Sequence, residues 1–131
     1  MRLSAEELIK RAEAAKEKAY APYSNFKVGA AVLTEDGGCY TGCNVENASF
    51  GLTCCAERVA VYAAVAGGQR RLQAIAISSD AAEFITPCGA CRQVLVEFNP
   101  GLKVIMANNK GEYRESTAAE LLPAAFSLKQ G

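Results

Sequence analysis

The placement of cysteines in a chain without histidine constrains this protein more than any other feature. Its 131 residues include six cysteines and no histidine. Four of the cysteines fall in two short segments, "TCCAER" (53–58) and "PCGACR" (87–92). Each segment stands at the start of a predicted helix. A fold that uses these thiols together must therefore bring two helix starts to one place.

The hydrophobic pattern predicts alternating helices and strands. A capping box at Ser4–Glu7 and apolar residues at helical spacing predict a helix over roughly 4–19. An Asp-Gly turn predicts a β-hairpin over 27–46, followed by a loop at 47–53. The other expected elements are a helix at 55–66, a strand at 72–79, a helix within 87–101, strands at 102–107 and 112–116, and a short helix at 117–126.

The link between the last two predicted strands limits the topology. It spans four residues, 108–111, whereas a parallel crossover needs about a dozen or more. These two strands should therefore form an antiparallel hairpin. The element order predicts an α/β fold in which helices cover a five-stranded mixed sheet. The chain length favours a single domain over 1–131.

Composition argues against several classes of partner. The net charge is zero and no basic stripe is evident, which argues against nucleic acid or an anionic membrane surface. The first 20 residues are charged throughout and lack the apolar core of a signal peptide. No apolar run approaches the ~20 residues that span a bilayer. We expect a cytoplasmic protein whose reduced cysteines serve metal binding or catalysis rather than disulfides.

The cysteine spacing predicts a metal site at the two helix starts. Cys88 and Cys91, three residues apart, share one helix face. The positive end of the helix dipole stabilises their thiolates, the form that binds zinc. Cys55 and Glu57 would point in nearly opposite directions within a regular helix. Both can face one site only if Cys55 lies at the helix cap, outside helical geometry.

Three thiols beside one carboxylate are typical of catalytic zinc, which keeps a coordination position for water. Without histidine, Glu57 becomes the candidate proton carrier. Three thiolates on Zn²⁺ leave a net charge of −1, which weakens its Lewis acidity. Two helix N-termini would offset part of that charge. Arg58 and Arg92 are candidates to hydrogen bond to the thiolates.

Other interpretations remain open on spacing alone. Cys88 and Cys91 could form a redox C-x-x-C pair. Cys54 could be a fourth ligand that closes a structural zinc site, although we expect it to be a small buried residue. Glu57 could be an ordinary acid of a first helical turn. Cys39 and Cys43 have no chemical assignment in this pattern, and we expect both to be small buried residues.

The sequence resembles a known family at these same positions. Cys-Ala-Glu at 55–57 and Pro-Cys-Gly-Ala-Cys at 87–91 fit the signature of the zinc nucleobase deaminases. The segments "YAPYSNFKVGAAV" (20–32), "GCNVENASFG" (42–51) and "PCGACRQVL" (87–95) are similar to the small homotetrameric cytidine deaminases. The resemblance covers essentially the whole chain. It implies a three-layer α/β/α fold, one zinc ion per chain, and a homotetramer that shares its sites between subunits.

The resemblance also implies a reaction. Cytidine and 2′-deoxycytidine would be hydrolysed to uridine and 2′-deoxyuridine with release of ammonia, as in pyrimidine salvage. Cys55, Cys88 and Cys91 would bind the zinc. Zinc-bound hydroxide would attack C4 of the pyrimidine while Glu57 shuttles protons to N3 and to the leaving amine.

The same resemblance implies substrate contacts. Asn44 and Glu46 would hold the ribose 3′-hydroxyl, and Phe26 would pack near the base. The backbone of Ala56 would contact the pyrimidine edge. Phe126 and the loop around Phe50 would reach into a neighbouring subunit's site. Many family members carry tyrosine where this chain has Phe50. Without the resemblance, Phe26 and Phe126 would be assigned to the hydrophobic core. Asn44 and Glu46, which alternate at the end of a strand, would be assigned to a solvated face.

Competing functions follow from the same residues. A deaminase of another aminopyrimidine nucleoside, such as a blasticidin-type antibiotic, would use the same chemistry. A non-catalytic zinc module or a thiol-redox protein would need only the cysteines. The predicted terminal hairpin and the neutral charge favour a free nucleoside over RNA or DNA, because the polynucleotide deaminases generally have a parallel last strand pair.

Overall fold

The computed structural model describes residues 3–128. Its helices and strands follow the chain in this order: α1 (Ala5–Lys16), β1 (Val28–Thr34), β2 (Cys39–Cys43), the 3₁₀ turn η1 (Phe50–Leu52), α2 (Ala56–Ala66), β3 (Leu72–Ser79), α3 (Gly89–Phe98), β4 (Lys103–Ala107), β5 (Tyr113–Thr117) and α4 (Ala118–Leu121).

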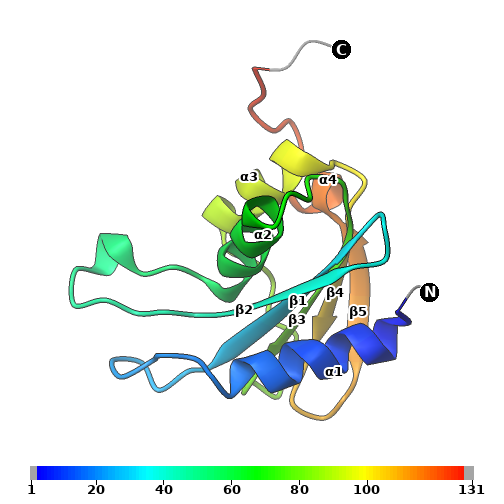
Figure 1. The fold of residues 1–131 in the computed structure, drawn as a ribbon. Helices are drawn as coiled ribbons and strands as arrows, with labels where there is room; N and C mark the ends of the chain where they lie inside the picture. Colours follow the sequence, from blue (N-terminus) through cyan, green and yellow to red (C-terminus); the bar gives the residue numbers. More distant parts are fainter. Residues whose placement is uncertain (1–2, 129–131) are drawn as a thin grey trace.

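The five strands form one mixed sheet in the order β2-β1-β3-β4-β5. Strand β1 pairs antiparallel with β2 and β3, β3 pairs parallel with β4, and β4 pairs antiparallel with β5. Helix α1 lies on one face of the sheet, whereas α2 and α3 lie on the other (Figure 1). The expected α/β fold with three layers and an antiparallel last pair is confirmed.

Two helices are shorter than expected. The last helix was expected over 117–126 but ends at Leu121, and Leu122 has non-helical φ and ψ of −141° and 73°. The next residue is Pro123, which disfavours helical geometry in the residue before it. The first helix ends at Lys16 rather than near residue 19. There the chain tightens into i−3 hydrogen bonds and Tyr20 donates its N–H to the carbonyl of Asn44.

Apolar side chains fill both faces of the sheet. Strand β3 illustrates this, because Ile75 and Ile77 pack towards α2 and α3 while Ala74 and Ala76 pack towards α1. A strand covered on both faces is nearly continuously apolar, as "LQAIAISS" is. Within residues 3–128, each helix is too short or too polar to cross a bilayer.

Two glycines let helix backbones touch the sheet directly. A Cβ at Gly42 of β2 would lie 2.4 Å from the Ala60 nitrogen and 2.7 Å from the Ala56 oxygen of α2. On the opposite face, a Cβ at Gly29 of β1 would lie 2.0 Å from the Ala12 oxygen of α1. Both contacts are with backbone atoms, which cannot move aside. Gly42 therefore fixes how closely the start of α2 approaches the sheet.

We expect Gly42→Ala to lower the free energy of unfolding by about 1–3 kcal/mol or more, because the added methyl group must displace α2. The measurement is the urea midpoint of wild type and variant. Gly101→Ala is the matched control, since a Cβ there meets only the Asn99 side chain at an ordinary 3.5 Å. Equal midpoints for the two variants would contradict this account of Gly42.

Candidate active site

The starts of α2 and α3 bring three thiols together. Cys55 caps α2 and Cys88 caps α3, both with extended backbone and without a capping hydrogen bond to the side chain. Cys91 is the third residue of α3. The three sulfur atoms lie within 4.8 Å of one another, and those of Cys55 and Cys88 are 3.8 Å apart. Two sulfurs bound at 2.3 Å to a tetrahedral zinc ion are also about 3.8 Å apart, so this donor set fits zinc.

Cys54 is outside this cluster. Among the described residues the group that could hold a metal ion consists of Cys55, Cys88 and Cys91. The backbone of Cys54 pairs with Val45 through two hydrogen bonds of 2.9 Å. Desolvation raises the pKa of the Cys54 thiol, which disfavours its thiolate. A closed site with four thiol ligands is therefore not formed.

The unassigned cysteines are less buried than expected. Cys39, Cys43 and Cys54 are each half-buried. Two of them lie on β2, which is an edge strand of the sheet. An edge strand has a neighbour on one side only, so its side chains keep some exposure.

Arg58 supports the thiol cluster electrostatically. Its Nη2 donates to the Cys55 sulfur at 3.4 Å. Hydrogen bonds from the Cys91 thiol and then from Arg58 lower the pKa of Cys55 to about 5. The hydrogen bond to Cys55 in turn raises the pKa of Arg58 above its usual value. Both hydrogen bonds favour the thiolate of Cys55, the form that binds zinc.

Arg92 acts through the backbone rather than through sulfur. Its Nε donates to the Pro87 carbonyl and its Nη1 to the Leu121 carbonyl, both at 2.7 Å. The neighbouring Gln93 side chain donates to the Phe126 carbonyl at 3.0 Å. Arg92 thus links Pro87, the residue before Cys88, to Leu121 at the end of α4.

Glu57 lies beside the cluster in a cavity of about 280 Å³. Its side chain is nearly buried, with 5% exposure, and burial raises its pKa to about 7. Six predicted site residues share the cavity with Glu57: Phe26, Asn44, Glu46, Cys55, Ala56 and Cys88. The structure thus brings the predicted proton carrier, most of the predicted substrate contacts and two of the thiols to one cavity.

Asn44 and Glu46 also hold the loop that precedes β1. The Asn44 amide donates to the Phe26 carbonyl at 2.8 Å and accepts from the Val28 N–H at 2.9 Å. The Glu46 carboxylate accepts from the backbone N–H groups of Tyr23 and Ser24 and from the Ser24 hydroxyl. The Ser24 hydroxyl is the main reason why the pKa of Glu46 is lowered.

The two remaining aromatic residues lie outside this cavity. Phe50 lines an adjacent cavity of about 400 Å³ with Tyr23, Ser24 and Glu46, and its side chain is 80% exposed. Phe126 lies near the C-terminal end of the described chain and is 69% exposed. It therefore does not line the thiol cavity of its own chain.

Sequence reasoning did not assign several residues that line the cavity. These are Ser24, Val28, Thr53, Ile85 and Thr86. All five stand within about three residues of an assigned one, so proximity in the chain to Phe26, Cys55 and Cys88 was the available signal. Ile85 and Thr86 carry no chemical pattern of their own, because they line the cavity only through the loop that leads into α3.

Comparisons with known proteins agree with this geometry. Residues 3–107 match the family model described as "Cytidine and deoxycytidylate deaminase zinc-binding region". A cytidine deaminase of Sporosarcina psychrophila is 49% identical over 126 residues, which cover 95% of this chain and 93% of the relative.

Solved structures agree as well. The crystal structure of cytidine deaminase from Burkholderia pseudomallei has a TM-score of 0.92 and 53% identity, covering 95% of this chain and all of that one (100%). The enzyme from Mycobacterium tuberculosis has a TM-score of 0.85 and 42% identity, covering 96% and 99%. Fold and thiol cluster are those of a zinc-dependent deaminase. The chain belongs to the cytidine and deoxycytidylate deaminase family.

We expect purified protein to contain one zinc ion per chain and Cys88→Ala to lose most of it, because two thiols would remain. Cys54→Ala is the matched control, since it removes the adjacent half-buried thiol outside the cluster. Elemental analysis after exhaustive dialysis measures both. Full occupancy in Cys88→Ala would mean that another residue replaces this ligand.

Proposed function

We propose that this protein hydrolyses cytidine and 2′-deoxycytidine to uridine and 2′-deoxyuridine with release of ammonia. The observation that carries the proposal is the buried acid Glu57 beside a three-thiol cluster, within one cavity of a deaminase-family chain. The proposal includes a single catalytic domain over 1–131. It also includes a role in pyrimidine salvage in the cytoplasm. Thiols stay reduced, and so available to bind zinc, in a reducing compartment, which supports that location.

Cys55, Cys88 and Cys91 would hold the zinc ion. When bound, zinc supplies the Lewis acid that activates water near neutral pH. Glu57 would accept one proton from the attacking water and deliver it to N3 of the base, and would then take the second proton from the new C4 hydroxyl and give it to the leaving amine, which departs as ammonia. Its nearly buried position within the cavity keeps this proton from exchanging freely with bulk water. Arg58 offsets part of the negative charge of the thiolates through its hydrogen bond to Cys55.

The sugar would be held by Asn44 and Glu46. An amide NH₂ has two N–H groups, and one of those of Asn44 donates to Phe26. The second can donate to the ribose 3′-hydroxyl. The Glu46 carboxylate keeps lone pairs beyond those that face Tyr23 and Ser24, and can accept from the same hydroxyl. Phe26 and the backbone of Ala56 line the part of the cavity that would take the base.

Exposed apolar side chains support a homotetramer with shared sites. Phe50, Leu52, Phe126 and Leu128 are all exposed, and they belong to two segments that project from the body of the fold (Figure 1). Large exposed apolar groups are typical of protein interfaces. In the assembly, Phe126 and the Phe50 loop would reach into the cavity of a neighbouring subunit.

We expect Glu57→Gln to keep its zinc but to lose turnover, because the amide cannot carry the proton. General acid–base catalysis alone accounts for about 10²–10⁴-fold in rate. The assay is the loss of cytidine absorbance and the release of ammonia over a panel of nucleosides. Glu35→Gln is the matched control, since this carboxylate lies in the exposed β1–β2 turn. A Glu57→Gln protein with near-normal kcat would disprove the role of Glu57.

We expect light scattering to give a mass about four times the 13.8 kDa chain. Phe126→Ala should raise KM for cytidine, because a residue from the neighbouring subunit leaves the site. Dilution of wild type below its association range should reduce activity. A fully active monomer would be incompatible with shared sites.

A further inference from the structure

We propose that Asp80 is a positioning residue for the nucleoside pocket. Together with Lys16, it fixes the backbone of residues 26–28, which carries Phe26 into the cavity. The inference rests on the proposed function, because it concerns one wall of the same cavity. Asp80 itself does not line that cavity.

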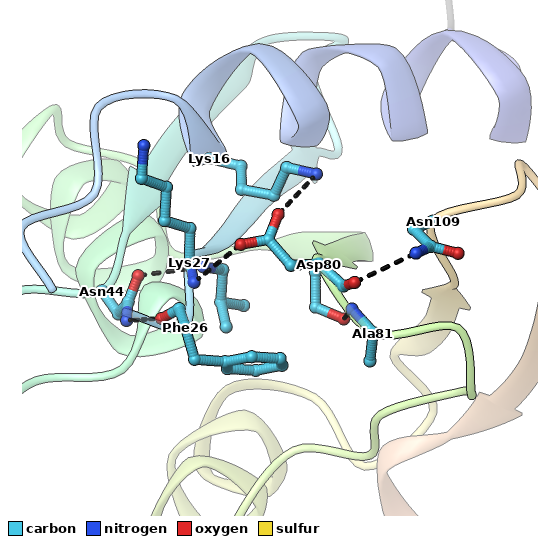
Figure 2. Close-up of polar contacts among 9 residues, drawn as sticks. Lys16, Phe26, Lys27, Asn44, Asp80, Ala81 and Asn109 are labelled. Carbon is cyan, nitrogen blue, oxygen red and sulfur yellow. Dashed lines mark hydrogen bonds and ion pairs between the residues drawn. The ribbon is translucent and has the colours of Figure 1, made fainter. Parts of the chain in front are cut away.

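Residues 26–28 are held from two sides (Figure 2). From the β2 side, the Asn44 amide binds the Phe26 carbonyl at 2.8 Å and the Val28 N–H at 2.9 Å. From the β3 side, the Lys27 N–H donates to Oδ2 of Asp80 at 3.2 Å. Strand β1 lies between β2 and β3 in the sheet. Residues 26–28, which lead into β1, are therefore hydrogen bonded to a residue that follows β2 on one side and to a residue that follows β3 on the other.

Asp80 is itself fixed in position. Its other carboxylate oxygen pairs with Lys16 Nζ at 3.3 Å (Figure 2). Its backbone carbonyl accepts from the Asn109 amide at 3.1 Å, and the next carbonyl, of Ala81, accepts from the Asn109 N–H at 2.8 Å. The carboxylate therefore presents its oxygens from an ordered turn at the end of β3.

The Lys16–Asp80 pair differs from an ordinary surface ion pair. The Lys16 side chain is 13% exposed and that of Asp80 is 44% exposed, so water screens the pair only partly. Lys16 reaches Asp80 because α1 rests directly on β1, where a Cβ at Gly29 would lie 2.5 Å from the Lys16 nitrogen. The pair thus links α1, on the face opposite the thiols, to the cavity wall.

Loss of Asp80 should affect binding more than chemistry. Phe26 and Val28 line the cavity, whereas Glu57 and the thiols belong to α2 and α3. Without the carboxylate, the Lys27 N–H has no fixed acceptor and the segment can shift relative to the base. A shift of this wall weakens the ground state and the transition state alike, which raises KM and leaves kcat nearly unchanged.

The test compares zinc-loaded variants. Asp80→Ala is expected to raise KM for cytidine about tenfold, with kcat within about threefold of wild type and unchanged zinc content. Asp80→Asn should restore most of the affinity, because an amide oxygen still accepts from Lys27. Lys16→Met, which keeps the Asp80 carboxylate, should raise KM to a smaller extent. Glu115→Ala is the matched control, since it removes an exposed ion pair with Lys103 at 3.7 Å.

Hydrogen exchange gives a readout that does not depend on turnover. Peptides covering 24–28 should exchange faster in Asp80→Ala and in Lys16→Met, while peptides from α2 and α3 keep the wild-type rate. A merely structural role would speed exchange across the whole sheet. If Asp80→Ala does not fold, the Lys16→Met variant carries the test.

The proposal would be overturned if Asp80→Ala left both KM and exchange at 24–28 unchanged, or if Lys16→Met did so where Asp80→Ala does not fold. An effect of Glu115→Ala equal to that of Asp80→Ala would also overturn it. So would a loss of zinc together with a loss of kcat in Asp80→Ala. A wild-type protein that fails to deaminate any nucleoside would instead refute the proposed function. The exchange measurement would still decide whether Asp80 holds this segment.

Discussion

The site depends on the direct backbone contact between α2 and β2 at Gly42. Without a side chain at this position, the first turn of α2 can lie against the sheet, with the Ala56 oxygen and the Ala60 nitrogen at distances that a methyl group would violate. That contact holds against the sheet the start of α2, which has Cys55 at its cap and Glu57 in its first turn. The start of α3 meets it from the other side and supplies two more thiols. The active-site geometry therefore follows from how closely a helix and a strand approach each other.

Two neighbouring groups experience opposite electrostatic environments. Cys55 lies where hydrogen bonds from Cys91 and Arg58 stabilise a negative charge, so its pKa falls. Glu57, two residues later, lies where burial disfavours a negative charge, so its pKa rises. The first environment suits a metal ligand and the second suits a group that carries a proton in both directions. A chain without histidine obtains both roles from one thiol and one carboxylate at a single helix start.

The parts of this fold that local rules govern could be predicted from the sequence. The four-residue link at 108–111 required an antiparallel pair, and the Cys55–Glu57 spacing required a helix cap. Pro123 indicates the early end of α4, because proline disfavours helical geometry in the residue before it, whereas the apolar pattern of 117–126 favours a longer helix. The contacts of Arg92 with Leu121 and of Asp80 with Lys27 could not be predicted, because they join segments far apart in the chain. Only the packing of α3 against α4 and the pairing of β1 with β3 bring these partners within hydrogen-bond range.

The close approach of α1 to β1 at Gly29 bears on the evolution of this chain. At Gly29, helix α1 touches β1 through backbone atoms, so the identity of residue 29 limits which residues are useful at 16 and 80. A larger residue at 29 would displace the helix and separate Lys16 from Asp80, so that Asp80 would keep only its hydrogen bond with the Lys27 N–H. We therefore expect positions 16, 29 and 80 to change together among related chains. A lineage that loses the glycine must find another way to order the entrance of β1.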